Sequence, residues 1–511
     1  MTKPDTPVAD PKYRRLVTLV AEAVNLQKVG YLLFWDQQCM MPKGGAAARG
    51  NHMALVGRLA HERLTSPEVG QLLEDLRDLE ASLPYDSDEA SFIRVTRREY
   101  EKATRVPPEL VDRLNRIQNE SFQVWLKARE AKDYRVFRPA LEEAYAARRD
   151  LAEALGYKDH PMDPLVDRFE PGLTVKDVEG LFDELRTALV PLVRAITDKA
   201  RGQADPAAVL QGHFPHDAQL AVGREAVRAI GFDLDTRGRL DLSVHPYTVD
   251  ISPDDVRITT RVNEQYVGQS FFACLHEAGH GLYAQGIPAR FQESPLGDGA
   301  SAGLHESQSR LWENIVGRSR AFWEFFLPRM KEHFPSLGGV TVEDMYRAVN
   351  KVETSLIRVE ADEVTYNLHI MVRWELEKAV FDGRLALADL AEAWNAKFEE
   401  YLGIRPPDDL LGVLQDIHWT SSFGAAFPGY TIGNVASIQL YERALADHPD
   451  LEAQFARGKF DTLLGWMQRN VHAHGAKFTP QELLTRVTGR PLTAEPYLSY
   501  IRRKFGELYG V

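Results

Sequence analysis

Cysteine is scarce in this sequence, since only Cys39 and Cys274 occur among 511 residues. Two thiols cannot form a disulfide framework, so we expect a chain that folds without covalent cross-links in a reducing compartment. The first twenty residues lack the continuous apolar stretch and small-residue cleavage site of a secretory signal. No stretch approaches the about 18 consecutive apolar residues of a membrane span. These absences predict a cytoplasmic protein.

Basic residues are outnumbered, because 61 Lys and Arg stand against 74 Asp and Glu and give a net charge of −13. Binding to nucleic acid or to an anionic membrane requires clustered positive charge, so neither is expected as a partner. The hydrophobic share of 44% and the charged share of 26% are typical of globular proteins and exclude wholesale disorder. Residues 1–10 are polar and contain two prolines, which predicts a mobile tail.

Strand patterns are also few, whereas apolar residues at helical spacing recur from Tyr13 onward. Only the window between about 239 and 263 alternates apolar and polar residues and is rich in β-branched side chains, which predicts two or three short strands. No phosphate-binding glycine loop, internal repeat or low-complexity linker occurs. We therefore predict a mainly α fold, large and bilobed, with a small β-sheet and a single domain over residues 11–511.

Several helix starts are marked by a threonine followed by an acidic residue at the third helical position, the arrangement of an N-cap. These pairs are Thr174 with Asp177, Thr341 with Asp344, and Thr479 with Glu482. Pro107 and Pro108 interrupt a long charged helical stretch, so one helix must end and another begin there.

The motif HExxH follows the strand window as His276, Glu277 and His280. On a helix, positions i and i+4 place both imidazoles on one face, where they can hold a tetrahedral zinc ion. Zinc lowers the pKa of a bound water toward ~7, and Glu277 is placed to act on that water. Cys274 points to nearly the opposite face, so we expect it in the core.

A third protein ligand is needed, and the sequence leaves several choices. The longer pattern HExxHxxGxxH fails because Tyr283 and Gly286 stand where it requires glycine and histidine. A glutamate on a later helix is the common alternative. The stretch from 286 to 303 is rich in glycine and proline and predicts a loop, after which Glu306 leads a helix and is the first candidate. The rivals that spacing leaves open are Glu293, His305 and Glu313.

These motifs resemble the carboxypeptidase Taq family of zinc metallocarboxypeptidases. HEAGH followed by HESQ is similar to the family's zinc-site motifs, and further blocks occur in the same order. His245-Pro246-Tyr247 resembles HPF; Asp255, Arg257 and Thr259 match DxRxT; Ile357, Arg358, Ala361 and Asp362 match IRxxAD; and Gly412, Gln415, Asp416, His418 and Trp419 match GxxQDxHW. The resemblance runs from about residue 13 to the C-terminus.

The resemblance implies a helical fold with a deep substrate groove and, in most members, a homodimer. It implies that His276, His280 and Glu306 hold one zinc ion per chain and that Glu277 is the general base. It further implies release of C-terminal amino acids from peptides with broad specificity, and cobalt can replace zinc in some members. One departure is a GAAFPGY segment, with Ala425 and Ala426 where the family commonly has FGYFPTY; Tyr430 is retained.

An exopeptidase must also recognise a free carboxylate, which a guanidinium group does best. Arg358 is the first candidate, mainly from the resemblance, and Arg257 and Arg405 are next. Arg257 and Arg310 have an alternative role as structural partners of carboxylates. The further candidate substrate contacts are His418, Tyr430 and His245. His472 and His474 have no nearby acidic partner in the sequence and are expected on the surface.

The leading hypothesis is therefore a zinc-dependent carboxypeptidase that acts on peptides with a free C-terminus. Two alternatives remain open from the sequence. The first is an endo-acting zinc oligopeptidase, which would tolerate a blocked C-terminus. The second is a catalytically silent peptide-binding scaffold of the same fold, against which the intact His276, Glu277, His280 and Glu306 argue.

Overall fold

The computed structural model of the chain describes residues 10–421 and 424–511. The predicted tail at residues 1–10 lies outside the described part except for Asp10, whose side chain caps the first helix. The helices of the first half are α1 (Pro11–Cys39), α2 (Ala46–Leu64), α3 (Pro67–Asp75), α4 (Arg77–Ser82), α5 (Asp88–Arg105), α6 (Pro108–Ala131), α7 (Tyr134–Leu155), α8 (Asp163–Asp167), α9 (Val175–Ala200) and α10 (His216–Ala229).

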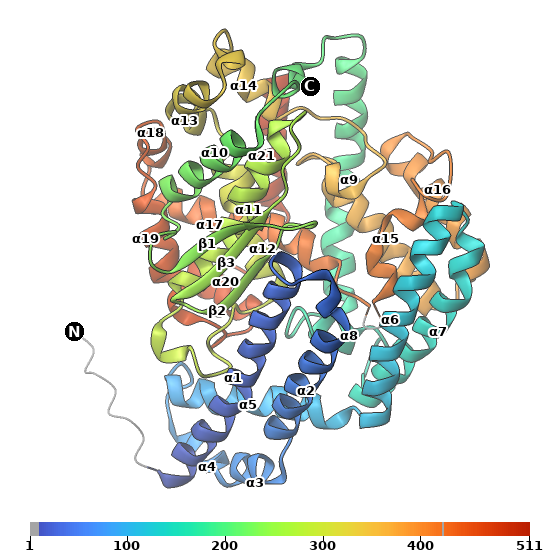
Figure 1. The fold of residues 1–511 in the computed structure, drawn as a ribbon, viewed down its shortest axis with the longest axis vertical. Coiled ribbons are helices and arrows are strands. Elements are labelled where there is room, and N and C mark those ends of the chain that lie inside the picture. The colour runs from blue at the N-terminus through green and yellow to red at the C-terminus, as the bar shows by residue number, and fades with distance from the viewer. Residues whose placement is uncertain (1–9, 422–423) are drawn as a thin grey trace.

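The second half is also mainly helical, as expected (Figure 1). Its helices are α11 (Val267–Gly286), α12 (Ala302–Arg310), α13 (Arg320–His333), α14 (Val342–Val349), α15 (Tyr366–Phe381), α16 (Leu390–Leu402), α17 (Pro428–Asp447), α18 (Leu451–Phe455), α19 (Asp461–Asn470), α20 (Pro480–Thr488) and α21 (Glu495–Tyr509). A π-helical segment, Leu311–Val316, follows α12 directly.

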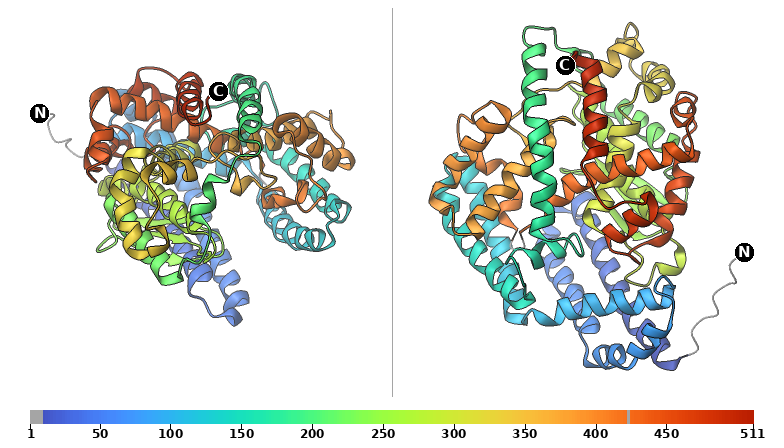
Figure 2. Two further views of the ribbon diagram at one scale, coloured as in Figure 1. Left: turned by 90° about the horizontal axis from the view of Figure 1, so that it is seen from above. Right: turned by 180° about the vertical axis from the view of Figure 1, so that it is seen from behind.

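The helices form two lobes, which Figure 2 shows most clearly from above. One lobe contains α6, α7, α15 and α16, and the other contains the sheet with α10 to α14 and α17 to α21. The long helix α9 connects them, because it packs against α15 and α16 of one lobe and against α21 of the other. The bilobed, mainly α prediction is confirmed.

A three-stranded sheet occupies the predicted window, with β1 (Gly238–Leu242), β2 (Thr248–Ser252) and β3 (Asp255–Thr260). The order is β1-β3-β2, with β1 parallel and β2 antiparallel to the central β3. β2 is therefore an edge strand, and α11 packs against both β2 and β3. The sheet thus lies beside the helix that carries HExxH, and the strand prediction is confirmed.

The helix-start predictions are also confirmed. Each of the three threonines accepts a hydrogen bond from the backbone N–H three residues on, and each acidic partner accepts one in return from the threonine N–H, at the starts of α9, α14 and α20. The break at the two prolines is present, since α5 ends at Arg105 and α6 begins at Pro108. Two orphan backbone donors are satisfied at each capped start, which fixes where these helices begin.

Helix α1 is long and apolar on average, although Glu22 and Lys28 interrupt its apolar residues, so the expectation of no continuous apolar run still holds. Over 18 residues its mean hydropathy reaches 1.3, so by length and composition it passes the test for a membrane span, with 28% of that window buried. It packs against α2, α3 and β2. Helices of this length and composition also occur as core helices of soluble proteins.

Two glycines allow the helices of the site to approach closely. A Cβ on Gly279 of α11 would lie 2.5 Å from Cα of Ser309 in α12, and one on Gly433 of α17 would lie 2.5 Å from Cγ of Glu306. Helix α12 is therefore held between α11 and α17 at distances that exclude a side chain at either glycine. This packing carries Glu306 to the histidines of α11.

Candidate metal centre

His276, His280 and Glu306 converge in the structure. One ligand atom from each side chain lies within 4.8 Å of the others. Oε2 of Glu306 is 3.7 Å from Nε2 of His276 and 3.5 Å from Nε2 of His280. Two imidazole nitrogens and one carboxylate oxygen form a donor set that suits catalytic zinc, which keeps a further position open. Of the residues that the sequence proposed as ligands, these three are the ones that the fold brings together as a potential donor set.

Glu277 lies beside this donor set and is buried. Its carboxylate accepts a hydrogen bond of 2.7 Å from Oγ1 of Thr248 in the edge strand β2. Burial raises the pKa of Glu277 above its ordinary value. A carboxylate with a raised pKa can both accept and return a proton near neutral pH, as a general base must.

Glu313 was a rival ligand and, on the sequence, equally compatible with a solvated surface. The structure places it in the interior, where its Oε2 accepts a hydrogen bond of 2.9 Å from Nδ1 of His276. Arg310 and Arg318 each pair with the same carboxylate, at 3.2 and 3.1 Å. Glu313 therefore orients His276 and leaves its Nε2 directed at the donor set.

Arg310 joins the two carboxylates, because its Nε also lies 2.7 Å from Oε1 of Glu306. Burial alone would raise the pKa of Glu306, but Arg310 and the two histidines outweigh it and hold that pKa well below its usual range. The structural role that the sequence left open for Arg310 is thus observed. It keeps Glu306 ionised and fixed while the second oxygen of that carboxylate faces the histidines.

His305, another rival, contacts His280 rather than the centre of the donor set. Its Nδ1 lies 2.7 Å from Nδ1 of His280 and can accept that hydrogen bond, which leaves Nε2 of His280 for a metal. Burial and the neighbouring His280 lower the pKa of His305 to about 4, so it is neutral at neutral pH. Glu293, the last rival, is exposed and lies 3.3 Å from Nδ2 of Asn25.

A second group of predicted residues forms around Arg358. Its Nη1 donates to the hydroxyl of Tyr366 at 3.1 Å, and its guanidinium lies 5.3 Å from the ring of Tyr430. The ring of Tyr366 also lies under Arg310, at 4.5 Å, which connects this group to Glu306. Within the described residues, no carboxylate comes within ion-pair distance of Arg358. The guanidinium is therefore still available for an acid.

His418 stands beside this group and is oriented by an acid. Oδ1 of Asp416 accepts a hydrogen bond of 2.7 Å from Nδ1 of His418, while Nε2 lies 3.4 Å from the hydroxyl of Tyr430. Ala425, part of the departure from the family pattern, is buried with φ = 56°, and its N–H donates to Oε1 of Glu377. Ala425 is thus held in the left-handed region of backbone conformation by a contact with Glu377, whose carboxylate also pairs with Arg373.

The other arginine candidates are already paired. Arg257 makes two hydrogen bonds of 2.8 Å to Asp255 and stacks on Trp35 at 4.1 Å, which favours the structural role considered for it. Arg405 is paired with Glu392 and Glu399 at the surface. His245 is exposed, with Nδ1 2.7 Å from the carbonyl oxygen of Pro246.

One expectation from the sequence is wrong. His472 is fully buried rather than on the surface, and its Nε2 lies 3.0 Å from Oε1 of Gln308 in α12. The partner is 164 residues away in the chain and is an amide, so a search for a nearby acid missed it. Cys274 is buried as expected, and burial raises its pKa to about 12.

Comparison with known proteins agrees with this geometry. The family model described as "Carboxypeptidase Taq (M32) metallopeptidase" matches residues 15–505. The chain belongs to this family. It is 43% identical over 507 residues to thermostable carboxypeptidase 1 of Thermus thermophilus, covering 98% of this chain and 99% of the relative. Carboxypeptidase 1 of Bacillus subtilis is 34% identical, over 94% and 95% of the two chains.

The structure also matches that of a solved M32 carboxypeptidase. The crystal structure of the M32 carboxypeptidase from Deinococcus radiodurans R1 superposes with a TM-score of 0.94 at 44% identity, covering 98% of this chain and 100% of that one. This M32 chain is thus a metallocarboxypeptidase, a peptide hydrolase, and a metal is expected in its active site.

The roles of Glu306 and Glu313 at the metal can be separated by measurement. Replacement of Glu313 by glutamine should lower metal affinity by about 10- to 100-fold, the usual cost of losing an outer partner of a ligating histidine. Replacement of Glu306 by alanine should cost more, because it removes a ligand oxygen. Competition with a metal-binding dye measures both affinities, and Glu293→Gln on the exposed loop serves as the control. Wild-type affinity in Glu306→Ala, with loss in Glu313→Gln, would make Glu313 the ligand.

Proposed function

We propose that the metal is one zinc ion per chain, held by His276, His280 and Glu306, and that the enzyme releases C-terminal amino acids with broad specificity. The proposal is supported by the convergence of two imidazole nitrogens and one carboxylate oxygen beside a buried glutamate. When bound there, zinc supplies a Lewis acid that lowers the pKa of water toward ~7 and polarises the scissile carbonyl. Cobalt has similar ligand preferences and is expected to substitute.

Glu277 acts as the general base in this proposal. It takes a proton from the attacking water and then passes that proton to the amine of the departing residue. The hydroxyl of Thr248 holds one oxygen of Glu277, so the other is free to face the water. Tyr430 is proposed to donate a hydrogen bond to a substrate oxygen, and His418, which Asp416 orients, is proposed to contact the substrate beside it.

Arg358 is proposed to bind the terminal carboxylate of the peptide. The observation that carries this step is the unpaired guanidinium, half-buried between aromatic rings and linked through Tyr366 and Arg310 to Glu306. Its planar group can pair with both oxygens of a carboxylate. A peptide anchored there places its last peptide bond toward the metal ligands and therefore loses one residue at a time.

Amidation of the substrate tests this step. Arg358→Ala should lower kcat/KM on free peptides by about ten- to a hundredfold, the value of a charge-assisted hydrogen bond of about 1.5–3 kcal/mol. Amidation should cause a similar loss in the wild type, yet little further loss in the variant, because both changes remove the same interaction. Arg358→Lys should recover only part of the loss. Arg405→Ala, which removes a paired surface arginine, is the matched control.

The results with free and amidated peptides separate a carboxypeptidase from an endo-acting enzyme. Equal turnover of amidated and free peptides by the wild type would favour an endo-acting oligopeptidase. If Arg358→Ala retained wild-type discrimination, the carboxylate contact would belong to another cation.

We also propose a reducing, cytoplasmic location and a homodimer. Both cysteines are free, and one is buried. Helices α1 and α2 expose large apolar side chains that a second copy could cover, namely Val29, Tyr31, Leu32, Phe34, Leu55 and Leu59. Peptides are the proposed partners, with no role for nucleic acid or membrane. Light scattering of the purified protein measures the number of chains per particle.

A further inference from the structure

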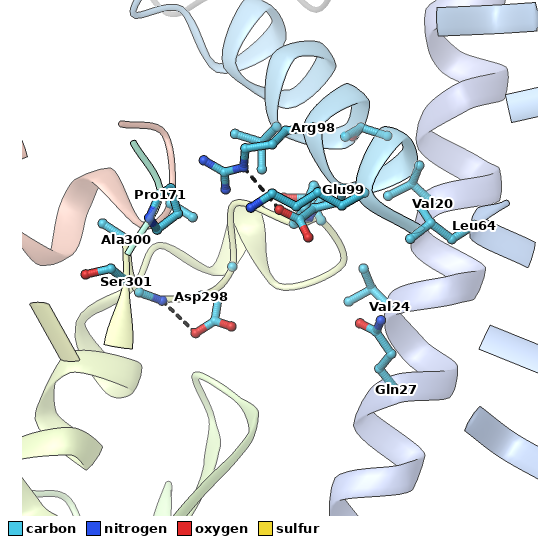
Figure 3. Close-up of a pocket in the computed structure, with 18 of the residues that line it drawn as sticks. Val20, Val24, Gln27, Leu64, Arg98, Glu99, Pro171, Asp298, Ala300 and Ser301 are labelled. Carbon is cyan, nitrogen blue, oxygen red and sulfur yellow. Dashed lines mark hydrogen bonds and ion pairs between the residues drawn. The ribbon is translucent and has the colours of Figure 1, made fainter. Parts of the chain in front are cut away.

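A cavity of about 480 Å³ adjoins the metal ligands through His305, and Arg358 is not among the described residues that line it. Figure 3 shows Val20, Val24 and Gln27 of α1 on one side of it, with Asp298, Ala300 and Ser301 of the α11–α12 connection across from them. His305 also lines the cavity, and through its contact with His280 the cavity adjoins the donor set. Its volume falls in the range of about 300–1,000 Å³ that is usual for ligand sites.

The position of the cavity relates it to the substrate. Arg358 is connected to Glu306 through Tyr366 and Arg310, whereas the cavity is connected to His280 through His305. A peptide whose terminal carboxylate is bound at Arg358 and whose last peptide bond lies at the ligands must continue away from Arg358. The cavity is thus where the part of the peptide upstream of the scissile bond would lie, if the proposed function holds.

Most of the charged groups that line the cavity are paired. Lys28 lies 2.6 Å from Asp250, Arg98 lies 3.1 Å from Glu99, and Lys102 lies 2.6 Å from Asp167. Figure 3 shows Arg98 and Glu99 of α5 at the top of the view, between the two sides of the cavity. These pairs offset the charges of Lys28, Arg98 and Lys102, and Arg168, the fourth basic residue of the lining, also has an interaction partner.

Asp298 is different. The carboxylate accepts a hydrogen bond of 2.7 Å from the N–H of Gly299, and no cation in the described part of the chain is within ion-pair distance of it. The side chain of Asp298 is exposed to solvent, while the protein packed around its carboxyl and the charge of Asp250 raise its pKa, with His305 and Lys28 acting in the opposite direction. An acid in these surroundings is stabilised by any cation that enters the cavity. The apolar side chains Val20 and Val24 opposite can pack against the aliphatic part of such a ligand.

We propose that Asp298 is a specificity-determining residue that binds a cationic group carried by the peptide upstream of the scissile bond. Two groups have this chemistry, the free α-ammonium of a short peptide and the side chain of lysine or arginine in a longer one. The contact rests on the proposed carboxypeptidase function and adds to it a preference for positively charged acyl portions. It acts on the substrate and not on the metal.

The test uses full-length enzyme loaded with zinc and four matched peptides with the same C-terminal residue. The peptides have a free or acetylated N-terminus, each with lysine or norleucine at one upstream position. In the wild type, the peptides with a cation should exceed the acetylated norleucine peptide by about tenfold in kcat/KM, from one charge-assisted contact. Asp298→Asn should reduce this ratio toward one. It should turn over the acetylated norleucine peptide as the wild type does.

Comparison of the four peptides identifies which group supplies the cation. If acetylation lowers kcat/KM and an upstream lysine does not restore it, the group that binds Asp298 is the α-ammonium. If an upstream lysine restores the kcat/KM of acetylated peptides, the group that binds Asp298 is the lysine side chain. Asp298→Glu should keep part of the preference, and Glu293→Gln, which removes an exposed charge from the same connection, should keep all of it. An unchanged ratio in Asp298→Asn, or no preference in the wild type, would overturn the proposal. Loss of C-terminal release from every peptide would instead contradict the proposed function.

Discussion

Replacement of Glu277 by glutamine should lower kcat by about 10²–10⁴-fold, the usual contribution of general acid–base catalysis. The amide has almost the same shape and can still accept the hydrogen bond from Thr248, but it cannot take a proton from water. The metal ligands are unchanged, so metal content should stay at the wild-type level. Steady-state kinetics together with metal analysis of the same preparation measures both effects.

This combination distinguishes a base from a ligand. Loss of activity together with loss of metal would mean that Glu277 supports the metal site instead of the proton transfer. Activity within a few-fold of the wild type would require another base. In that case His245 would be the next residue to replace.

Removal of the metal by a strong chelator should abolish essentially all hydrolysis. Without the ion, the three ligands hold nothing that can polarise the scissile carbonyl or lower the pKa of water. Zinc or cobalt should restore activity, because both suit a site with two imidazoles and one carboxylate. Activity assays before and after reconstitution measure the effect.

The protein should remain folded during this treatment. The contacts of Glu313 with His276, Arg310 with Glu306 and His305 with His280 are made between protein groups and do not require a metal ion. Far-UV circular dichroism of the metal-free protein should therefore match that of the loaded protein. Full activity in protein shown to be free of metal would contradict the account.

Local features of the chain were predictable from the sequence. A capping threonine and its acidic partner lie three residues apart, so the starts of α9, α14 and α20 depend on neighbours that the sequence places together. The same holds for His276 and His280, which one helix brings to one face. Alternation of β-branched residues located the three strands, although it could not predict that β3 would lie between β1 and β2.

Some residues that orient the metal ligands do so through contacts between elements far apart in the chain. The sequence alone did not identify these contacts. Glu313 and His276 are 37 residues apart, and Glu313 on its own is equally compatible with a solvated helix face. His472 contacts Gln308, which is 164 residues away in the chain, and Arg257 stacks on Trp35 of the distant helix α1. Periodicity describes which face a residue is on, but not what packs against that face.

The most direct test of the account is the position of the metal. Crystals of the zinc-loaded protein, measured on both sides of the zinc absorption edge, give an anomalous difference map in which bound zinc appears as a peak. The account predicts one peak per chain, in contact with Nε2 of His276, Nε2 of His280 and a carboxylate oxygen of Glu306. A peak bound by Glu313 in place of Glu306, or no peak beside the HExxH histidines in active protein, would contradict it.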